Sequence, residues 1–197
     1  MTTLCVHGSQ YESWAEALRY SAFQIISLGT STGFATADTS VWPSFAQLIM
    51  IFFILQCAYA SSTSGGIKVD RIVIYWKAIT KRIRKIKHPS AVITPKINKG
   101  AISEDVLEAG ILYISLYIGI VFLSSLVLTA LGIDSLTAFS GSAATMGNVG
   151  PGFGIVGSMS NFGQIPVLGK WVLTATMLLG RVEIFGLILF FTVRSWR

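Results

Sequence analysis

Two glycine-rich loops in this sequence have the composition of a backbone site for a monovalent cation. The first reads Thr30-Ser31-Thr32-Gly33-Phe34, and the second reads Gly147-Asn148-Val149-Gly150-Pro151. Glycine adopts backbone dihedral angles that are closed to other residues, so it allows successive carbonyl oxygens to point toward one axis. Such neutral oxygens of moderate field strength can replace the water shell of the ion. We therefore interpret both loops as ion-coordinating backbone.

Each loop follows a short apolar segment that would position it. An Ala-Phe pair stands near the start of each segment, at Ala22 in the first copy and at Ala138 in the second. From the first residue of these pairs, the spacing is eleven residues to Gly33 and twelve to Gly150. The segment 135–144, as a helix of about ten residues, covers ~15 Å. That is half of the ~30 Å hydrocarbon thickness of a bilayer.

Irregular backbone at membrane depth is tolerated only where it lines a water-filled path enclosed by protein. A half-length helix directs its partially negative C-terminal end at such a loop and favours a cation there. A phosphate site would need a helix N-terminus instead. Since an apolar segment of spanning length follows each loop, the sequence contains a repeat of half-helix, re-entrant loop and spanning helix.

The composition indicates a membrane environment. The chain has 197 residues, of which 52% are hydrophobic and only 12% are charged, and its mean hydropathy is +0.66. No Asp, Glu, Lys or Arg occurs between Asp38 and Lys68 or between Glu108 and Asp134, and each gap exceeds the ~20 residues that a spanning helix needs. We predict three spanning helices, over residues 43–60, 106–131 and 170–193.

The basic residues set the predicted orientation. Ten of the fifteen Lys and Arg residues lie in one segment: Lys68, Arg71, Lys77, Lys81, Arg82, Arg84, Lys85, Lys87, Lys96 and Lys99. Basic loops stay on the cytoplasmic side of a membrane, so we expect the connector 68–103 and the C-terminus, which carries Arg194 and Arg197, to be cytoplasmic. Because the connector joins two membrane helices, we interpret its charge as membrane retention or contact with a partner protein, not as nucleic-acid binding.

Several motifs together resemble the Trk/Ktr/HKT superfamily of potassium transporters. Residues 31–36 are similar to the third pore loop of that superfamily, and residues 146–154 are similar to the fourth pore loop of its Trk branch. Residues 64–68 and 178–183 also match. The resemblance implies an all-α membrane protein built from four M1-P-M2 units around one pore. This chain would cover about one and a half units of a bacterial K⁺ uptake subunit and would be a fragment of a longer protein.

The resemblance also implies boundaries. Residues 1–67 would hold the pore helix, filter loop and M2 of the third unit, followed by the basic connector 68–103. Residues 104–197 would form the fourth unit, with M1 at 104–131, the pore helix and filter at 134–154, and M2 at 168–194.

The same resemblance assigns roles to residues. The filter residues would be Ser31, Thr32, Gly33, Asn148, Val149 and Gly150, with K⁺ bound by the backbone carbonyls of Ser31, Thr32, Asn148 and Val149. The small-residue segment with Ser64, Gly65 and Gly66 would be a gating loop within the membrane. From the sequence alone it can also be a helix end followed by a turn.

Two charged residues have alternative interpretations. Arg181 lies in a predicted membrane helix, where an arginine costs at least ~2.5 kcal/mol. It would set a barrier to cations beside the gate, or form a structural ion pair. Asp38 either attracts cations at the outer mouth or is a solvated loop acid.

The implied function is K⁺ uptake across the bacterial inner membrane, with K⁺ as the transported ion and no cofactor. The implied partners are a second copy, as a homodimer, a cytoplasmic nucleotide-binding ring protein (TrkA-like) and the lipid bilayer. No nucleophile–base pair or paired carboxylates indicate an enzyme. Two alternatives remain: a secondary transporter with re-entrant hairpins, which would bind an organic anion at half-helix N-termini, and a truncated, non-conducting subunit.

Overall fold

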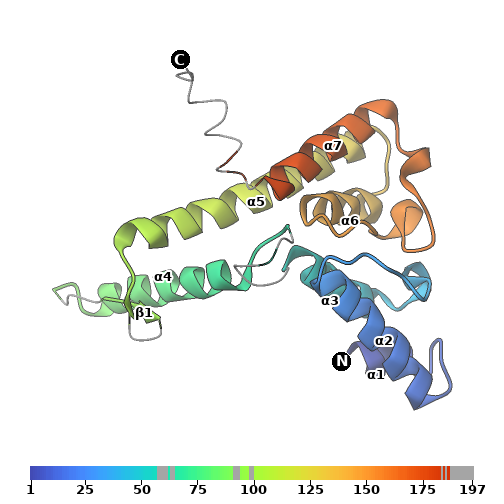
Figure 1. Cartoon of the computed structure of the whole chain (residues 1–197), viewed down its shortest axis with the longest axis horizontal. Helices are drawn as coiled ribbons and strands as arrows, with labels where there is room; N and C mark the ends of the chain where they lie inside the picture. The colour runs from blue at the N-terminus through green and yellow to red at the C-terminus, as the bar shows by residue number, and fades with distance from the viewer. Residues whose placement is uncertain are drawn as a thin grey trace.

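The structure, a computed structural model, describes residues 1–56, 62, 65–90, 94–97, 100–182, 184 and 186. Within these residues the chain is almost entirely helical (Figure 1). The α-helices are α1 (Thr2–Val6), α2 (Trp14–Gly29), α3 (Ser44–Leu55), α4 (Val69–Lys87), α5 (Glu104–Ala130), α6 (Ser135–Met146) and α7 (Val167–Arg181). The 3-10 turns are η1 (Thr39–Val41), η2 (Gly154–Val156) and η3 (Phe162–Gln164). Strands β1 (Lys96–Ile97) and β2 (Gly100–Ala101) form one antiparallel hairpin.

Helix α5 is the scaffold for the C-terminal part of the chain. It contains 27 residues, which at the helical rise is ~40 Å. Helix α4 lies beside its N-terminal half, and α6 and α7 pack against its C-terminal half (Figure 1). The order α5, α6, α7 is long helix, short helix, helix. Since α2 and α3 repeat the last two of these elements, the structure confirms the expected pattern of one and a half M1-P-M2 units.

The predicted spanning helices are realised to different extents. Among the described residues, α5 alone is long and apolar enough to cross a bilayer. Helix α3 is apolar but has only 12 residues and ends at Leu55, five positions before the predicted end at residue 60. Helix α7 is described as far as Arg181, and most of the remaining predicted span, 182–193, lies outside the described residues.

The segment interpreted as a basic connector begins as a regular helix. Helix α4 has 19 residues and packs against α5, with Ile74 contacting Gly110 so closely that a Cβ at Gly110 would be 2.8 Å from Ile74 Cγ2. Toward its N-terminal end, the Arg71 guanidinium lies 3.5 Å from the ring centroid of Tyr113 on α5. These contacts make α4 part of the packed structure.

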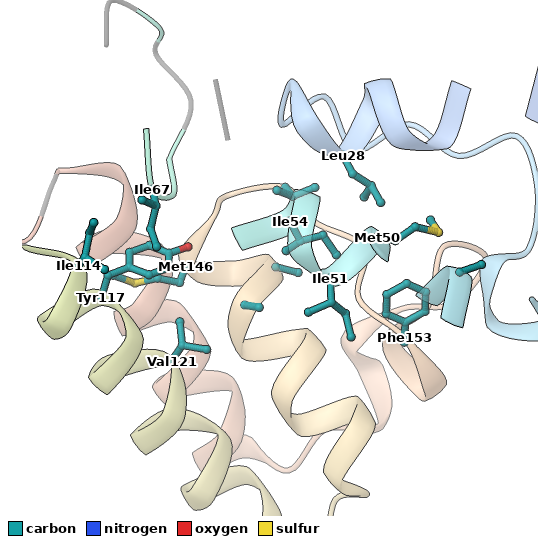
Figure 2. Packing of buried hydrophobic residues seen from close by; sticks show 14 of the residues in the cluster. Leu28, Met50, Ile51, Ile54, Ile67, Ile114, Tyr117, Val121, Met146 and Phe153 are labelled. Carbon is teal, nitrogen blue, oxygen red and sulfur yellow. The ribbon is translucent and has the colours of Figure 1, made fainter. Parts of the chain in front are cut away.

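One hydrophobic cluster joins the two units. Figure 2 shows Ile67, which follows the loop after α3, beside Ile114 and Tyr117 of α5 and Met146 at the end of α6. The same view shows Ile51 and Ile54 of α3 close to α6. Because α3 and α6 also pack directly on each other, the loops that follow α2 and α6 are held close together.

Candidate functional site

The two short helices α2 and α6 end in the same backbone motif. In each copy, the second residue after the helix donates its N–H three residues back, and the third donates five residues back, which together form a Schellman motif. The bonds are Ser31 N–H to Leu28 O at 3.1 Å, Thr32 N–H to Ser27 O at 2.9 Å, Asn148 N–H to Thr145 O at 3.1 Å and Val149 N–H to Ala144 O at 2.9 Å. The predicted repeat is therefore present at the level of individual hydrogen bonds.

The loops also share their unusual dihedral angles. Ser31 and Asn148 have φ of 55° and 53°, and the glycines two positions later, Gly33 and Gly150, have φ of 74° and 107°. Among the described residues other than glycine, these two have positive φ, which is uncommon and is best tolerated by Asn. The backbone match pairs Ser31 with Asn148 and Gly33 with Gly150. The sequence analysis pairs the same residues, since it already places the two Ala-Phe pairs eleven and twelve residues before these glycines. The hydrogen bonds at the helix ends, from Thr32 N–H to Ser27 O and from Val149 N–H to Ala144 O, fix this register.

The two loops touch each other directly. A Cβ on Gly33 would lie closer to the Val149 carbonyl oxygen than real Cβ atoms come to any neighbour, so only glycine fits there. Farther along each loop, the Ser158 hydroxyl donates to the Ala37 carbonyl at 3.0 Å and accepts from the Thr39 N–H at 3.1 Å. The loops that follow α2 and α6 thus form one connected structure.

Side chains from the short helices brace each loop from behind. Ser27 of α2 donates its hydroxyl to the Phe34 carbonyl at 2.6 Å, and the buried Gln24 amide donates to the Ala37 carbonyl at 3.0 Å. In the second copy, the buried Ser140 hydroxyl accepts from the Phe153 N–H at 2.9 Å. The sequence analysis did not identify these bracing residues, although polar residues in a short apolar segment are a signal for them.

The segment before Ile67 reaches the second loop. Ile67 N–H bonds to the Leu55 carbonyl at 3.0 Å, which closes the base of a loop between α3 and α4. A Cβ on Gly65 would be 2.8 Å from the Gly147 carbonyl oxygen and 2.9 Å from Asn148 Nδ2. Gly65 and Gly66 are both buried, whereas Ser64 lies outside the described residues.

The C-terminal end of α7 lies against the same place. The Asn148 side-chain amide donates to the Met177 carbonyl at 3.2 Å, and Gly180 is so close to the Met146 carbonyl oxygen that a Cβ could not fit. Arg181, the last residue of α7, is exposed in this chain and adjoins Gly180. Residues 146–148 therefore contact both the loop after α3 and the end of the helix that carries Arg181.

The remaining residues of the site determine which chemical groups could coordinate an ion there. Thr32 and Gly150 are exposed, and Val149 is buried. The Asp38 carboxylate accepts from the Ser40 N–H at 2.9 Å and caps η1. In the part of the chain that the structure describes, no group of three or more His, Cys, Asp or Glu side chains is arranged to bind a metal ion. The chemistry available at the loops is that of backbone carbonyls and hydroxyls.

Comparison with known proteins gives consistent matches over almost the whole chain. Residues 8–196 match the TrkH family, described as cation transport proteins. The Trk system potassium uptake protein TrkH of Halomonas elongata is 36% identical over 189 residues, covering 96% of this chain and 39% of that protein. The protein of the same name from Escherichia coli K12 is 35% identical, covering 95% of this chain and 38% of that protein.

A solved structure gives the same match. The crystal structure of the potassium transporter TrkH from Vibrio parahaemolyticus superposes with a TM-score of 0.86 at 35% identity. It covers 100% of this chain, which in turn covers 42% of that chain. This chain therefore spans less than half the length of the relatives that it matches.

Proposed function

This chain belongs to the TrkH family of cation transport proteins, and on that premise we propose that it contributes two quadrants of a K⁺-selective filter. The observation that carries the proposal is the duplicated loop backbone, with Ser31 and Asn148 both in the left-handed region and a positive-φ glycine two positions later. The proposed K⁺ ligands are the backbone carbonyls of Ser31, Thr32, Asn148 and Val149, next to Gly33 and Gly150. Potassium is named as the cargo because it is the ion in the names of the relatives.

We propose that the segment containing Ser64, Gly65 and Gly66 gates this path, together with Arg181. The contact of Gly65 with Gly147 and Asn148 supports this role, because it brings the segment to the inner end of the second loop. Arg181 follows Gly180, which packs on the carbonyl of Met146. A positive charge at this position would raise the barrier to a cation that leaves the filter.

The topology and assembly are also proposals. In the inner membrane of a bacterium, residues 68–103 and the C-terminus would face the cytoplasm. Units 1–67 and 104–197 would form the third and fourth of four repeats, in a homodimer regulated by a TrkA-like nucleotide-binding ring protein. The direction of α2 and α6 argues against an organic-anion transporter, since both helices present their C-terminal ends to the loops.

The test is ion flux through the intact protein that carries this chain, purified and reconstituted into liposomes. We expect K⁺ or Rb⁺ to enter down its gradient and to be preferred over Na⁺, while an organic anion does not enter. Empty liposomes and liposomes with an unrelated membrane protein provide the controls. Equal K⁺ and Na⁺ fluxes would contradict the proposed selectivity, and a coupled flux of an organic anion would contradict the proposed function itself.

A further inference from the structure

The α4–α5 pair contains a hollow that the ion path does not use. It has a volume of about 470 Å³. Tyr75 and Ile79 line it from α4, Leu107 and Ile111 line it from α5, and Arg82 lies at one end. Figure 1 shows that much of the α4–α5 pair projects away from α2 and α3 and from the loops after α2 and α6. Events in this hollow can therefore be tested separately from the filter.

The register of the two helices places the hollow relative to a membrane. At the inner end of the pair, Lys81 of α4 forms an ion pair with Glu104, the first residue of α5. Nearer the middle of α5, Ile74 contacts Gly110. If the basic residues from Lys81 onward lie on the inner face, as positive-inside charge predicts, residues near Ile74 lie in hydrocarbon. The first turns of α4 would then lie within the membrane, and only the later part of the predicted connector 68–103 would face the cytoplasm. Residues from Lys81 onward then lie at the level of the lipid headgroups.

The basic residues that line the hollow differ in their ion pairs. Lys81 is paired with Glu104, so Arg82 and Lys85 supply the remaining positive charge. The same two residues line a second hollow of about 310 Å³ with Ile86 and Pro89, and both are exposed. Two carboxylates also line the first hollow, that of Glu104, which is paired with Lys81, and that of Glu108, which opposes the charge of Arg82 and Lys85.

We propose that this hollow binds an anionic phospholipid of the inner leaflet. Arg82 and Lys85 would hold its phosphate, since a guanidinium and an ammonium group make charge-assisted hydrogen bonds to phosphate oxygens. One acyl chain would lie along Tyr75, Ile79 and Ile111. Basic pockets between membrane helices on the cytoplasmic side are suited to such headgroups. The proposal goes beyond ion conduction and rests only on the inward orientation of α4.

The experiment measures phospholipid retained by the intact protein that carries this chain, by native mass spectrometry after delipidation and addition of phosphatidylglycerol or phosphatidylcholine. We expect phosphatidylglycerol to bind at least several-fold more tightly than phosphatidylcholine. The double variant Arg82→Gln/Lys85→Gln should weaken phosphatidylglycerol binding about tenfold, because each basic side chain near the membrane surface contributes measurably. Glu108→Gln should strengthen phosphatidylglycerol binding, since it removes the opposing charge.

The matched control is Arg84→Gln/Lys87→Gln, which removes one Arg and one Lys from exposed positions of α4 at the same predicted depth that do not line either hollow. This variant should retain phosphatidylglycerol like the parent protein. If both double variants lost phosphatidylglycerol binding equally, the lipid would be held by a diffuse basic surface, and the proposal of a defined site would be overturned. Equal binding of phosphatidylglycerol and phosphatidylcholine would contradict the proposed preference for an anionic headgroup. A hollow from which a second copy of the protein or a regulatory protein excludes lipid would overturn the proposal as a whole.

Discussion

Alanine substitutions at three glycines with positive φ can distinguish the effect of backbone strain from a change in the proposed filter. Gly33, Gly150 and Gly132 have φ of 74°, 107° and 89°, so alanine at any of them costs about 1–3 kcal/mol in backbone strain. A Cβ would meet nothing within 4 Å at Gly150 or Gly132, whereas at Gly33 it would collide with the Val149 carbonyl oxygen. Gly132 follows α5 and lies outside both loops, which makes it the matched control.

We expect all three alanine variants to lose stability and only the two loop variants to change ion selection. Gly132→Ala should lower the melting temperature of the protein and leave the K⁺ to Na⁺ flux ratio of the remaining folded protein unchanged. Gly33→Ala should have the largest effect, because Val149 O must move away from its place as a proposed ligand. A loss of only ~1.4 kcal/mol in the free energy of K⁺ binding weakens that binding tenfold. We therefore expect the K⁺ to Na⁺ flux ratio to fall at least tenfold.

The assay combines size-exclusion chromatography of the intact protein, for the folded amount, with K⁺ and Na⁺ flux in liposomes at equal protein. Growth of a K⁺-uptake-deficient strain across a series of K⁺ concentrations gives an independent measurement. If Gly33→Ala and Gly150→Ala folded but kept the parental flux ratio, the loops would not form the filter. If Gly132→Ala changed the ratio as much as Gly150→Ala, strain alone would explain the effect.

Three further changes test the surroundings of the loops. Arg181→Ala should alter the transport rate with little loss of folded protein, while loss of the fold would support a structural ion pair. Ser158→Ala removes the hydroxyl that bonds Thr39 N–H, at a cost of about 1 kcal/mol, so hydrogen exchange at that amide should accelerate; unchanged exchange would refute the bond. Gly180→Ala should separate α7 from the second loop and reduce transport, whereas Gly119→Ala, with nothing within 4 Å of its Cβ, should not.

The architecture and loop positions could be predicted because they depend on local patterns. Charge-free stretches predict α5 within two residues of its observed N-terminal end, and positive-φ positions select glycine at Gly33 and Gly150. The register between the two loops could also be predicted, because the sequence pairs Gly33 with Gly150 although their spacings from the Ala-Phe pairs differ by one residue. It is set by main-chain hydrogen bonds to Ser27 and Ala144, which any residue type can form.

The sequence could not predict where α3 ends or that α4 is a helix. No charged residue follows Leu55 before Lys68, so the sequence extends the helix to residue 60. Helix α3 nevertheless ends at Leu55, where the Leu55 carbonyl accepts from Ile67 N–H. The many basic residues after Lys68 indicate a basic connector and obscure the helical spacing of Tyr75, Ala78 and Ile79. Contacts distant in sequence, such as Ser158 with Ala37, have no local signal at all.

The two loops share a backbone but differ in what they contact, and under the proposed function this difference would separate ion selection from gating. In the second loop, Gly147 and Asn148 contact Gly65 and α7. At the position of the first loop that matches Gly147, the Thr30 hydroxyl bonds within its own segment, to Ile26 O, Ser27 O and Thr32 Oγ1. Carbonyl ligands depend on backbone geometry, which both loops share, so both can serve selection. If the segment around Gly65 is the proposed gate, its movement would reach the second loop first, because Gly65 lies against Gly147 and Asn148. The coupling between the proposed gate and the proposed filter would then be unequal around the pore.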